Sequence, residues 1–260
     1  MNPIVKVIAH TKFIGVPGDL MPSEGYNAVV MKGQDKGSDA ARLIECAGRT
    51  CYDSFGQGRP SAEYHQHIRE VGHGSVLEHA SISFYLDNIS RGLTHELVRH
   101  RAGCAISQRS TRYVDESGSP WVLHPLIDKL LPKETKQAQD MALAIQACRH
   151  SYDAIVECVQ ANLILAGADK QTARKQARGA ARGLLGNALC TSMVWTANIR
   201  ALRNVLEQRA SEFADAEIRV LANRLYEEAL LVCPEWFSDY EKVTCPDGIG
   251  YGLRTKYRKV

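Results

Sequence analysis

Residues 99–113, RHRAGCAISQRSTRY, concentrate side chains that bind anions and polar heterocycles. The first three are two arginines around a histidine, and the last six carry amide, hydroxyl and guanidinium groups. Such groups can hold the imide edge of a pyrimidine by hydrogen bonds and a phosphate by bidentate pairing. For RHR alone, a solvated helix end with cations at its C-terminus is the alternative explanation. The closeness of SQRSTRY favours a ligand site.

A second group of cations repeats every fourth residue in ARKQARGAARG, at Arg174, Arg178 and Arg182. On one side of a helix such charges repel by roughly a few tenths of a kcal/mol per pair, unless an anion or carboxylate lies between them. An anionic ligand is one explanation. Exposed arginines on a helix that packs through its alanines explain Arg174 and Arg178.

A third cluster, in TANIRALRNVLEQRA, places Asn198, Arg200, Asn204 and Arg209 in and after the start of a predicted helix. Amide and guanidinium groups there can contact a polar ligand, although this cluster alone is weak evidence for a site.

Two histidines in VGHGSVLEHAS, His73 and His79, are potential metal ligands just before a predicted strand. Their HxxxxxH spacing is not a zinc signature, and no third ligand lies nearby. The sequence therefore predicts no metal site.

The composition is that of a globular protein with one large or two small domains: 260 residues, of which 45% are hydrophobic. The formal charge is +3, well below the excess typical of proteins that wrap nucleic acid. A basic nucleic-acid-binding protein is the hypothesis from a second class. It predicts steep salt dependence and exposed aromatic side chains among the cations.

The chain shows no pattern of a secreted or membrane protein. Its eight cysteines form no CxxC pair, which is typical of free thiols in a reducing cytosol. The start MNPIVKVIAHTKFIG lacks a long apolar region, and no run approaches the about 18 apolar residues of a membrane span. We expect a cytoplasmic protein. GxGxxG and GxxxxGK[ST] are missing, which argues against a Rossmann or P-loop site.

The elements that must position these clusters are mostly helices. Period-two alternation and capping residues predict strands and helices in an α+β fold, with too few strands for a doubly wound sheet. We predict strands over 3–9, 80–88 and 193–198, and helices over 39–47 (capped by Ser38, stopped by Gly48), 61–71, 91–101 (capped by Ser90), 133–166, 170–186 (started by Asp169), 198–210 and 214–232.

Taken together, the clusters resemble one family, the flavin-dependent thymidylate synthases. The family signature is RHR, seven residues and then Ser. The blocks GHGSVLEHAS, ISRGLTHELVRHR, SQRSTRY, RKQARGAARGLL and RASEFADAEIR occur here in the family's order. The likeness covers about residues 35–240, and we treat residues 1–260 as a single domain. We assign residues 1–34 and 243–260 no functional role and expect them to lie at the surface.

The resemblance implies a helix-rich α+β domain with a small antiparallel sheet, assembled as a homotetramer whose active sites are shared between subunits. The implied enzyme is a flavoprotein that methylates C5 of a uridylate, converting dUMP to dTMP. FAD is the implied cofactor, methylene-tetrahydrofolate supplies the carbon and NADPH the electrons. No nucleic acid, membrane or metal is implied.

The resemblance also assigns roles to individual residues. Flavin-binding positions are occupied by Ser75, Arg99, His100, Arg101, Gln108, Asn198, Ile199, Arg200 and Asn204. Nucleotide-binding positions are occupied by Glu96, Arg99, Gln108, Arg109, Ser110, Thr111, Arg112, Arg182 and Arg209. Four residues fall on positions close to the chemistry, namely Arg209, Ser110, His73 and Tyr113.

The chemistry explains two of these residue types. C5 of uracil is a poor nucleophile, so an enzyme without a cysteine on C6 must enrich the ring electronically. Arg209, beside the N3 and O2 edge, would stabilise the ring as its N3 anion. A nucleophilic Ser110 would need an adjacent base, and its neighbours are arginines, so we assign Ser110 to binding or orientation.

Three departures from the family pattern concern the nucleotide side. Eight residues, not seven, separate Arg101 from Ser110; Arg109 stands where an aliphatic residue is common; and LLG replaces Leu-Pro near residue 185. A longer loop could admit a different sugar. Methylation of UMP to 5-methyl-UMP, with or without dUMP, is therefore the alternative reaction.

Overall fold

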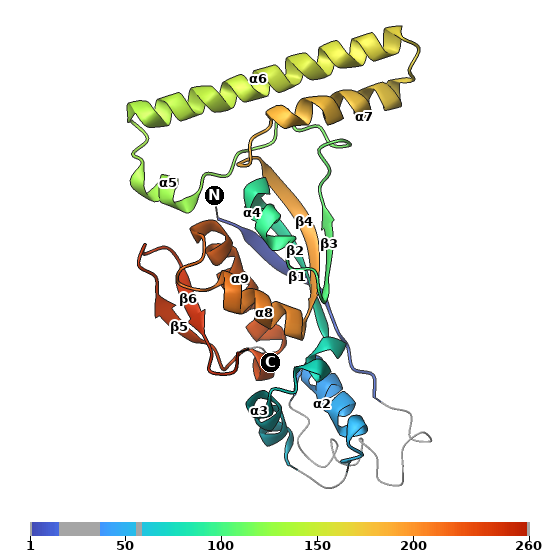
Figure 1. The fold of residues 1–260 in the computed structure, drawn as a ribbon, viewed down its shortest axis with the longest axis vertical. Coiled ribbons are helices and arrows are strands. Elements are labelled where there is room, and N and C mark those ends of the chain that lie inside the picture. The colour runs from blue at the N-terminus through green and yellow to red at the C-terminus, as the bar shows by residue number, and fades with distance from the viewer. Residues whose placement is uncertain (1, 16–36, 56–58, 259–260) are drawn as a thin grey trace. The chain divides into compact units, whose positions relative to one another are not determined.

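The computed structural model describes residues 2–15, 37–55 and 59–258 (Figure 1). The stretch GVPGDLMPSEGYN, residues 15–27, whose Gly, Pro and Asn content predicts turns, lies, apart from Gly15, outside these ranges. In chain order the elements are β1 (Ile4–His10), α2 (Asp39–Cys51), α3 (Ser61–Val71), η2 (Gly74–His79), β2 (Ser81–Ser90), α4 (Arg91–Leu97), β3 (Cys104–Gln108), α5 (Pro125–Leu130), α6 (Lys136–Leu165), α7 (Lys170–Ala181), η3 (Arg182–Leu184), β4 (Cys190–Asn198), α8 (Ile199–Arg209), α9 (Ala216–Val232), η4 (Pro234–Trp236), β5 (Glu241–Thr244) and β6 (Tyr251–Arg254).

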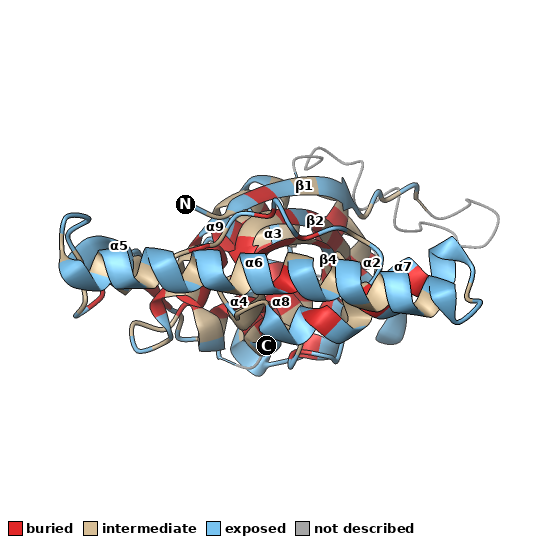
Figure 2. Ribbon diagram, turned by 90° about the horizontal axis from the view of Figure 1, so that it is seen from above, coloured by how far each residue is buried: buried red, intermediate tan, exposed pale blue. Residues whose placement is uncertain are grey.

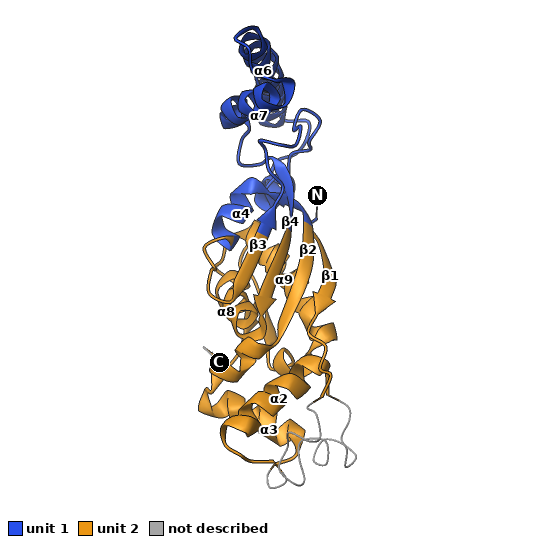
Figure 3. Cartoon of the chain, turned by 90° about the vertical axis from the view of Figure 1, so that its right-hand side faces the viewer, with its two compact units in different colours: residues 1–3, 87–97, 107–193 blue, residues 4–86, 98–106, 194–260 orange. Residues whose placement is uncertain are grey.

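The chain packs as two compact units (Figure 3). Unit 1 comprises residues 1–3, 87–97 and 107–193, and unit 2 comprises residues 4–86, 98–106 and 194–260. The boundary falls within strands β2, β3 and β4, so each of these strands contributes residues to both units. The assignment of one domain stays a prediction.

Within the described residues, β1, β2, β4 and β3 form a small antiparallel sheet in that order. Its direction follows from the ends: Thr11, after β1, bonds Ser81 at the start of β2. Asn198, at the end of β4, donates from its N–H to the carbonyl of Gly103, just before β3, at 2.9 Å. The helix-rich α+β prediction is confirmed.

The alternation that predicted β2 is confirmed by burial. Ile82, Phe84 and Leu86 are fully buried, whereas Tyr85 between them is exposed. Phe84 stacks on Trp195 of β4, with ring centroids 5.9 Å apart, so the buried faces of the two strands pack as one layer. The predicted strand over 193–198 is confirmed and begins earlier, at Cys190.

Several predicted helix ends are wrong; α7, for example, ends at Ala181 and not at residue 186. Helix α2 begins after the Ser38 cap as predicted, but it runs through Gly48 to Cys51. The glycine serves packing, because a Cβ there would lie 1.8 Å from the hydroxyl of Tyr64 on α3. Helix α4 is capped by Ser90 as predicted, yet it ends at Leu97, so RHR follows the helix instead of closing it.

Helices α6 and α7 of unit 1 pack against each other. The predicted long helix is confirmed over Lys136–Leu165, capped by Thr135. The sequence pattern also predicts an apolar, buried face on it, formed by Met141, Ile145, Cys148, Tyr152, Ile155 and Val159, and this burial is not found. Of its thirty residues, all of them described, Tyr152 alone is buried, and Figure 2 shows mostly exposed ribbon along α6. No helix in the described ranges is long and apolar enough to cross a membrane.

The C-terminal segment, left unassigned from residue 243, forms a hairpin of β5 and β6 in unit 2. Leu253 of β6 donates its N–H to the carbonyl of Ala210, just after α8, at 2.7 Å. Arg203 of α8 is fully buried and pairs with Asp239, Nη1 to Oδ1 at 2.8 Å. The segment therefore supports α8, which was not apparent from its composition.

Candidate functional site

Two neighbouring cavities in unit 2 lie along the solvent side of α8. They have volumes of about 310 and 470 Å³, within or near the usual range for small-ligand sites. The first is lined by Glu78, Ala102, Gly103, Asn198, Arg200, Ala201, Asn204 and Glu207. The second is lined by Arg99, His100, Arg101, Ala102, Ala201, Asn204, Gln208 and Arg209. The flavin-side residues of RHR and of α8 thus converge although about a hundred positions separate them.

The start of α8 is shaped by Asn198 and Gly103. Asn198 caps the helix, its Oδ1 accepting from the N–H of Ala201 at 2.7 Å. Gly103 has φ +71° in the turn before β3, and a Cβ there would lie 2.5 Å from Nδ2 of Asn198. Only glycine combines that backbone conformation with so close an approach to the cap.

Arg209 and His100 are joined directly at the other end of α8. Nε of Arg209 donates to Nε2 of His100 at 3.0 Å, so the imidazole must present an unprotonated nitrogen there. Burial, and then the charges of Arg209 and Arg99, lower the pKa of His100. The neutral histidine that this bond requires is therefore the form favoured at neutral pH.

Other flavin-side predictions lie nearby or inside the core. Ser75 in η2 is exposed, and the His73 ring stacks on Tyr52 with centroids 6.2 Å apart. Arg200 pairs with Glu78. Ile199 is fully buried and its N–H bonds the carbonyl of Ala80, so neither its side chain nor its amide faces the cavities.

The nucleotide-side residues Gln108–Tyr113 all belong to unit 1, and Gln108 is the last residue of strand β3. Nε2 of Gln108 donates to the hydroxyls of Thr94 and Thr191, at 3.1 and 3.5 Å. These bonds engage the amide nitrogen, which leaves Oε1 as the side-chain group able to accept a hydrogen bond from a ligand.

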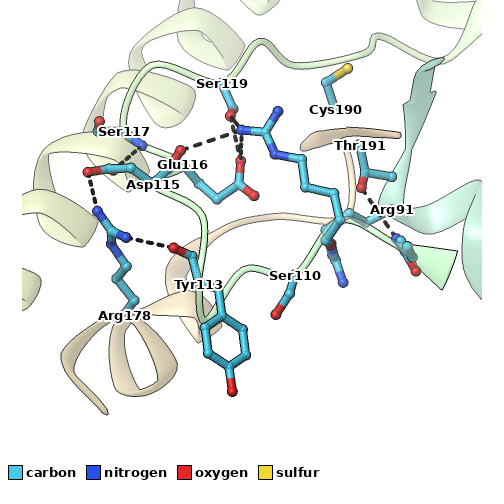
Figure 4. Close-up of polar contacts among 12 residues, drawn as sticks. Arg91, Ser110, Tyr113, Asp115, Glu116, Ser117, Ser119, Arg178, Cys190 and Thr191 are labelled. Atoms are coloured by element: carbon cyan, nitrogen blue, oxygen red, sulfur yellow. Dashed lines mark hydrogen bonds and ion pairs between the residues drawn. The ribbon is translucent and has the colours of Figure 1, made fainter. Parts of the chain in front are cut away.

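The charge of Arg109 is matched within the protein by Glu116, which lies beside Ser119 in Figure 4. Its Nη2 lies 3.0 Å from Oε2 of Glu116 and 2.9 Å from Oγ of Ser119. Glu116 is 2% exposed, so this is a buried carboxylate with a fixed cation.

Ser110 and Tyr113 point away from that ion pair in Figure 4. In the described residues, the hydrogen bond to Ser110 Oγ comes from the N–H of Arg112 at 3.4 Å, with no histidine or carboxylate bonded to it. Tyr113 is 60% exposed, and a hydrogen bond with Lys175 lowers its pKa. Thr111 is buried, while Arg112 is exposed.

The alternative explanation of the arginine stripe, exposed arginines at Arg174 and Arg178, fits Arg174 but not Arg178, which is half-buried and paired with Asp115. Arg178 bonds the carbonyl of Tyr113 at 2.9 Å and a carboxylate oxygen of Asp115 at 2.6 Å, so its role is structural. Arg174 and Arg182 are exposed, and Arg182 remains available to a ligand. Glu96 lies half-buried on α4, in the same unit.

Sequence reasoning missed Gly103, Glu116 and Arg91. Arg91 is half-buried; burial lowers its pKa, as does the charge of Arg182. Its Nη1 reaches the carbonyl of Arg109 at 3.4 Å, and no carboxylate pairs with it in the described chain. The available signal was the arginine directly after the Ser90 cap, at a helix start where a cation is unfavourable without an anion.

The described residues hold no group of three or more His, Cys, Asp or Glu side chains arranged for a metal ion. The donors around both cavities are guanidinium and amide groups, which suit anions and heterocycles.

Comparison with known proteins identifies the same segments. Residues 34–235 match the family model described as thymidylate synthase complementing protein. A flavin-dependent thymidylate synthase of Mycobacterium avium strain 104 is 44% identical over 213 residues, covering 79% of this chain and 82% of its own.

Two further relatives carry the same name. The protein of Mycolicibacterium gilvum strain PYR-GCK is 43% identical over 215 residues, which cover 80% of this chain and 82% of that protein. The protein of Mycobacterium marinum is 39% identical over 251 residues, or 94% of this chain and 92% of that protein.

Proposed function

The chain belongs to the flavin-dependent thymidylate synthases, and from that premise we propose that it methylates C5 of dUMP to give dTMP. FAD is its proposed cofactor, with methylene-tetrahydrofolate and NADPH as cosubstrates. The observation that carries the proposal is the convergence of His100, Arg209 and Asn204 on one cationic cavity along α8.

The residues present fit a flavin nucleotide. Three arginines, Arg99, Arg101 and Arg209, line one cavity, where they can pair with phosphate. The adjoining cavity is lined by the side-chain amide of Asn198 and by Gly103, whose lack of a side chain lets a ligand approach its backbone closely. When bound, the flavin would supply the redox chemistry and carry the one-carbon unit.

Arg209 has the part closest to the pyrimidine. Its guanidinium is held through Nε by His100 and would direct N–H donors toward the N3 and O2 edge. A fixed cation there stabilises the N3 anion and enriches C5 without reorganising during the reaction. Protonation of His100 at low pH would remove the acceptor and release Arg209, so we expect activity to fall on the acid side.

On the nucleotide side, Gln108 offers its amide oxygen, and Ser110, Arg112 and Arg182 offer donors to the phosphate. Ser110 has no base to activate it in the described chain, which supports binding and orientation over nucleophilic attack.

The register of β3 bears on the sugar. Gly103 pairs with Asn198 and Arg109 with Ser192, six steps on both strands, so no bulge lies between them. We infer that the extra residue after Arg101 is absorbed before Gly103, in the turn that Cys104 closes on Arg101. That turn lines the flavin-side cavities. The extra residue therefore gives no reason to expect a ribose on the nucleotide side, and dUMP is the proposed substrate in preference to UMP.

We also propose a cytoplasmic homotetramer with shared sites. Long helix α6 leaves large apolar side chains exposed, among them Leu143, Ile155 and Leu165. In a symmetric oligomer, further copies of the chain would cover this apolar face in every subunit.

The test begins with the purified protein. Flavin absorbance, or its recovery on adding FAD, should accompany dTMP formation from dUMP with methylene-tetrahydrofolate and NADPH. UMP in a parallel reaction should give little or no product. A colourless protein that FAD does not reconstitute would contradict the enzyme, and equal turnover of UMP would contradict the preference for dUMP.

A further inference from the structure

Arg109 is the residue of the signature segment that direct nucleotide binding explains least. Its guanidinium contacts Glu116 at 3.0 Å and Ser119 at 2.9 Å, and Ser119 donates its hydroxyl to the same carboxylate. Glu116 and Ser119 are 2% and 5% exposed. A cation already paired with a buried carboxylate has little net charge left for a phosphate.

We propose that Arg109 is a positioning residue. With Glu116 and Ser119 it closes residues 110–118 into a preformed loop that presents Ser110 and Arg112 to the phosphate of the nucleotide. This inference rests on the proposed function for the identity of the ligand, but the closed loop itself does not depend on it.

The contacts along the loop show how the closure works (Figure 4). Arg109 and Ser119 stand at its two ends and meet through Nη2 and Oγ. Inside the loop, the N–H of Val114 donates to the carbonyl of Ser110 at 3.0 Å, which forms a helical turn. Arg178 of α7 holds the middle through the carbonyl of Tyr113.

A second helix secures the far end, because Arg149 of α6 donates from Nη2 to the carbonyl of Ser119 at 2.9 Å. The loop is thus tied at its base by Arg109 and at two further points by the α6 and α7 pair. Arg112, exposed between these ties, has its main chain fixed and its side chain available.

The buried carboxylate of Glu116, paired with an Arg109 side chain that is 34% exposed, gives this proposal a sharp test. Removal of Arg109 leaves that carboxylate buried and unpaired, whereas removal of both charges with retained packing can be nearly neutral. A direct phosphate ligand behaves differently, because losing its partner Glu116 as well cannot restore a contact to the phosphate.

The experiment compares R109L, R109K, E116Q and the double variant R109L/E116Q, in which an amide oxygen remains for Ser119. R174L, at an exposed arginine of α7, is the matched control. The dissociation constants of dUMP and deoxyuridine are measured. The constant of deoxyuridine divided by that of dUMP reports how much the phosphate contributes to binding. Arg112→Leu serves as the variant of a proposed direct ligand.

We expect R109L to weaken dUMP binding by about tenfold or more, R109K to recover part of it, and R109L/E116Q to return to within about threefold of the parent. The ratio of the two constants should survive in the double variant and fall in Arg112→Leu. A double variant as weak as R109L, with the phosphate contribution lost, would show that Arg109 is itself a ligand and overturn the proposal.

A ligand-free measurement separates the loop from the proposed function. Trypsin cleavage after the exposed Arg112 should accelerate about tenfold in R109L and return near the parent rate in R109L/E116Q, with R174L unchanged. If the parent binds no dUMP, the proposed function fails, but the cleavage rate still shows whether Arg109 and Glu116 close the loop. Equal cleavage of R109L and the parent would overturn the closed loop, and if R109L does not fold, R109K and the double variant give the same comparison.

Discussion

At the scale of single residues, the site depends on which charges are free and which are matched. Arg109 and Arg178 have carboxylate partners in unit 1, while Arg112 and Arg182 are exposed. Arg209 is oriented by an imidazole that adds no charge of its own. An arginine-rich motif can therefore combine cations that are paired within the protein with cations proposed to bind a ligand, and the contacts of each distinguish the two groups.

The replacement of Arg209 tests the role of a cation that His100 orients. We expect Arg209→Ala to slow the chemical step by about 10²–10³, the usual cost of losing one anion-stabilising donor. Single-turnover rates with bound flavin and saturating dUMP measure that step apart from binding. Arg224→Ala, at an exposed arginine of α9 paired with Glu227, is the control and should keep the parent rate. A normal rate in Arg209→Ala would contradict the assigned role.

His65 of α3 predicts how stability responds to acid. Burial lowers its pKa from 6.5 to about 4, against the opposing charge of Glu45, whose Oε2 lies 3.8 Å from Nε2. Below pH 6.5 the unfolded state takes up a proton that the folded state refuses, so stability falls until about pH 4. The shift corresponds to about 3 kcal/mol.

Urea midpoints measured between pH 7 and pH 4 check this. His65→Gln should lose this part of the acid sensitivity and show a flatter profile, because its amide does not titrate. The exposed His150, changed to Gln, is the control and should keep the parent slope. Parallel profiles for the parent and His65→Gln would refute the proposed cause.

At the scale of elements, sequence patterns predicted most of the framework and fewer of the contacts. The alternation of Ile82, Phe84 and Leu86 identified β2, because a half-buried strand must repeat every second residue. Strand β3 was missed, since CAISQ is short and its burial is partial throughout. Its pairing with β4 comes from residues far along the chain, which local patterns do not contain.

Among the candidate residues, the same limit applies. The caps Ser38, Ser90 and Asp169 could be predicted because a cap acts on its own helix. The partner of Arg109 could not, because Glu116 lies in a loop whose closure depends on tertiary packing.

The turn before β3 gives a prediction that separates backbone strain from crowding. Gly103 and Gly72 share φ +71°, but a Cβ at Gly72 meets nothing within 4 Å, whereas one at Gly103 meets Asn198 at 2.5 Å. Gly72→Ala should therefore cost only the left-handed backbone, about 1 kcal/mol, and leave flavin affinity unchanged.

Gly103→Ala should cost more, because the methyl group must displace the α8 cap, and it should weaken FAD binding. Flavin fluorescence titration and denaturant unfolding of both variants provide the comparison. Equal effects of the two substitutions on FAD affinity would show that the contact with Asn198 does not shape the cavity.

At the scale of the whole molecule, the surface of unit 1 is the feature that a single chain explains least. Helix α6 has thirty residues, all described, and only one of them is buried. Two of its large apolar side chains are strongly exposed, Leu143 at 63% and Leu165 at 86%. Such exposure costs solubility unless another surface covers it. The two side chains lie outside the face predicted to be apolar, which the pairing with α7 covers only in part.

This surface argues for self-association through α6. We expect the parent to have the mass of a tetramer in light scattering after size exclusion, and Leu143→Glu to shift it to smaller species, because a buried charge would be left unpaired at the contact. Gln171→Glu adds the same charge at an exposed site of α7 and should leave the mass unchanged. If dissociation also lowers FAD affinity, the second copy completes the flavin site; a monomeric parent, or a Leu143→Glu variant of unchanged mass, would place the contact elsewhere or remove it.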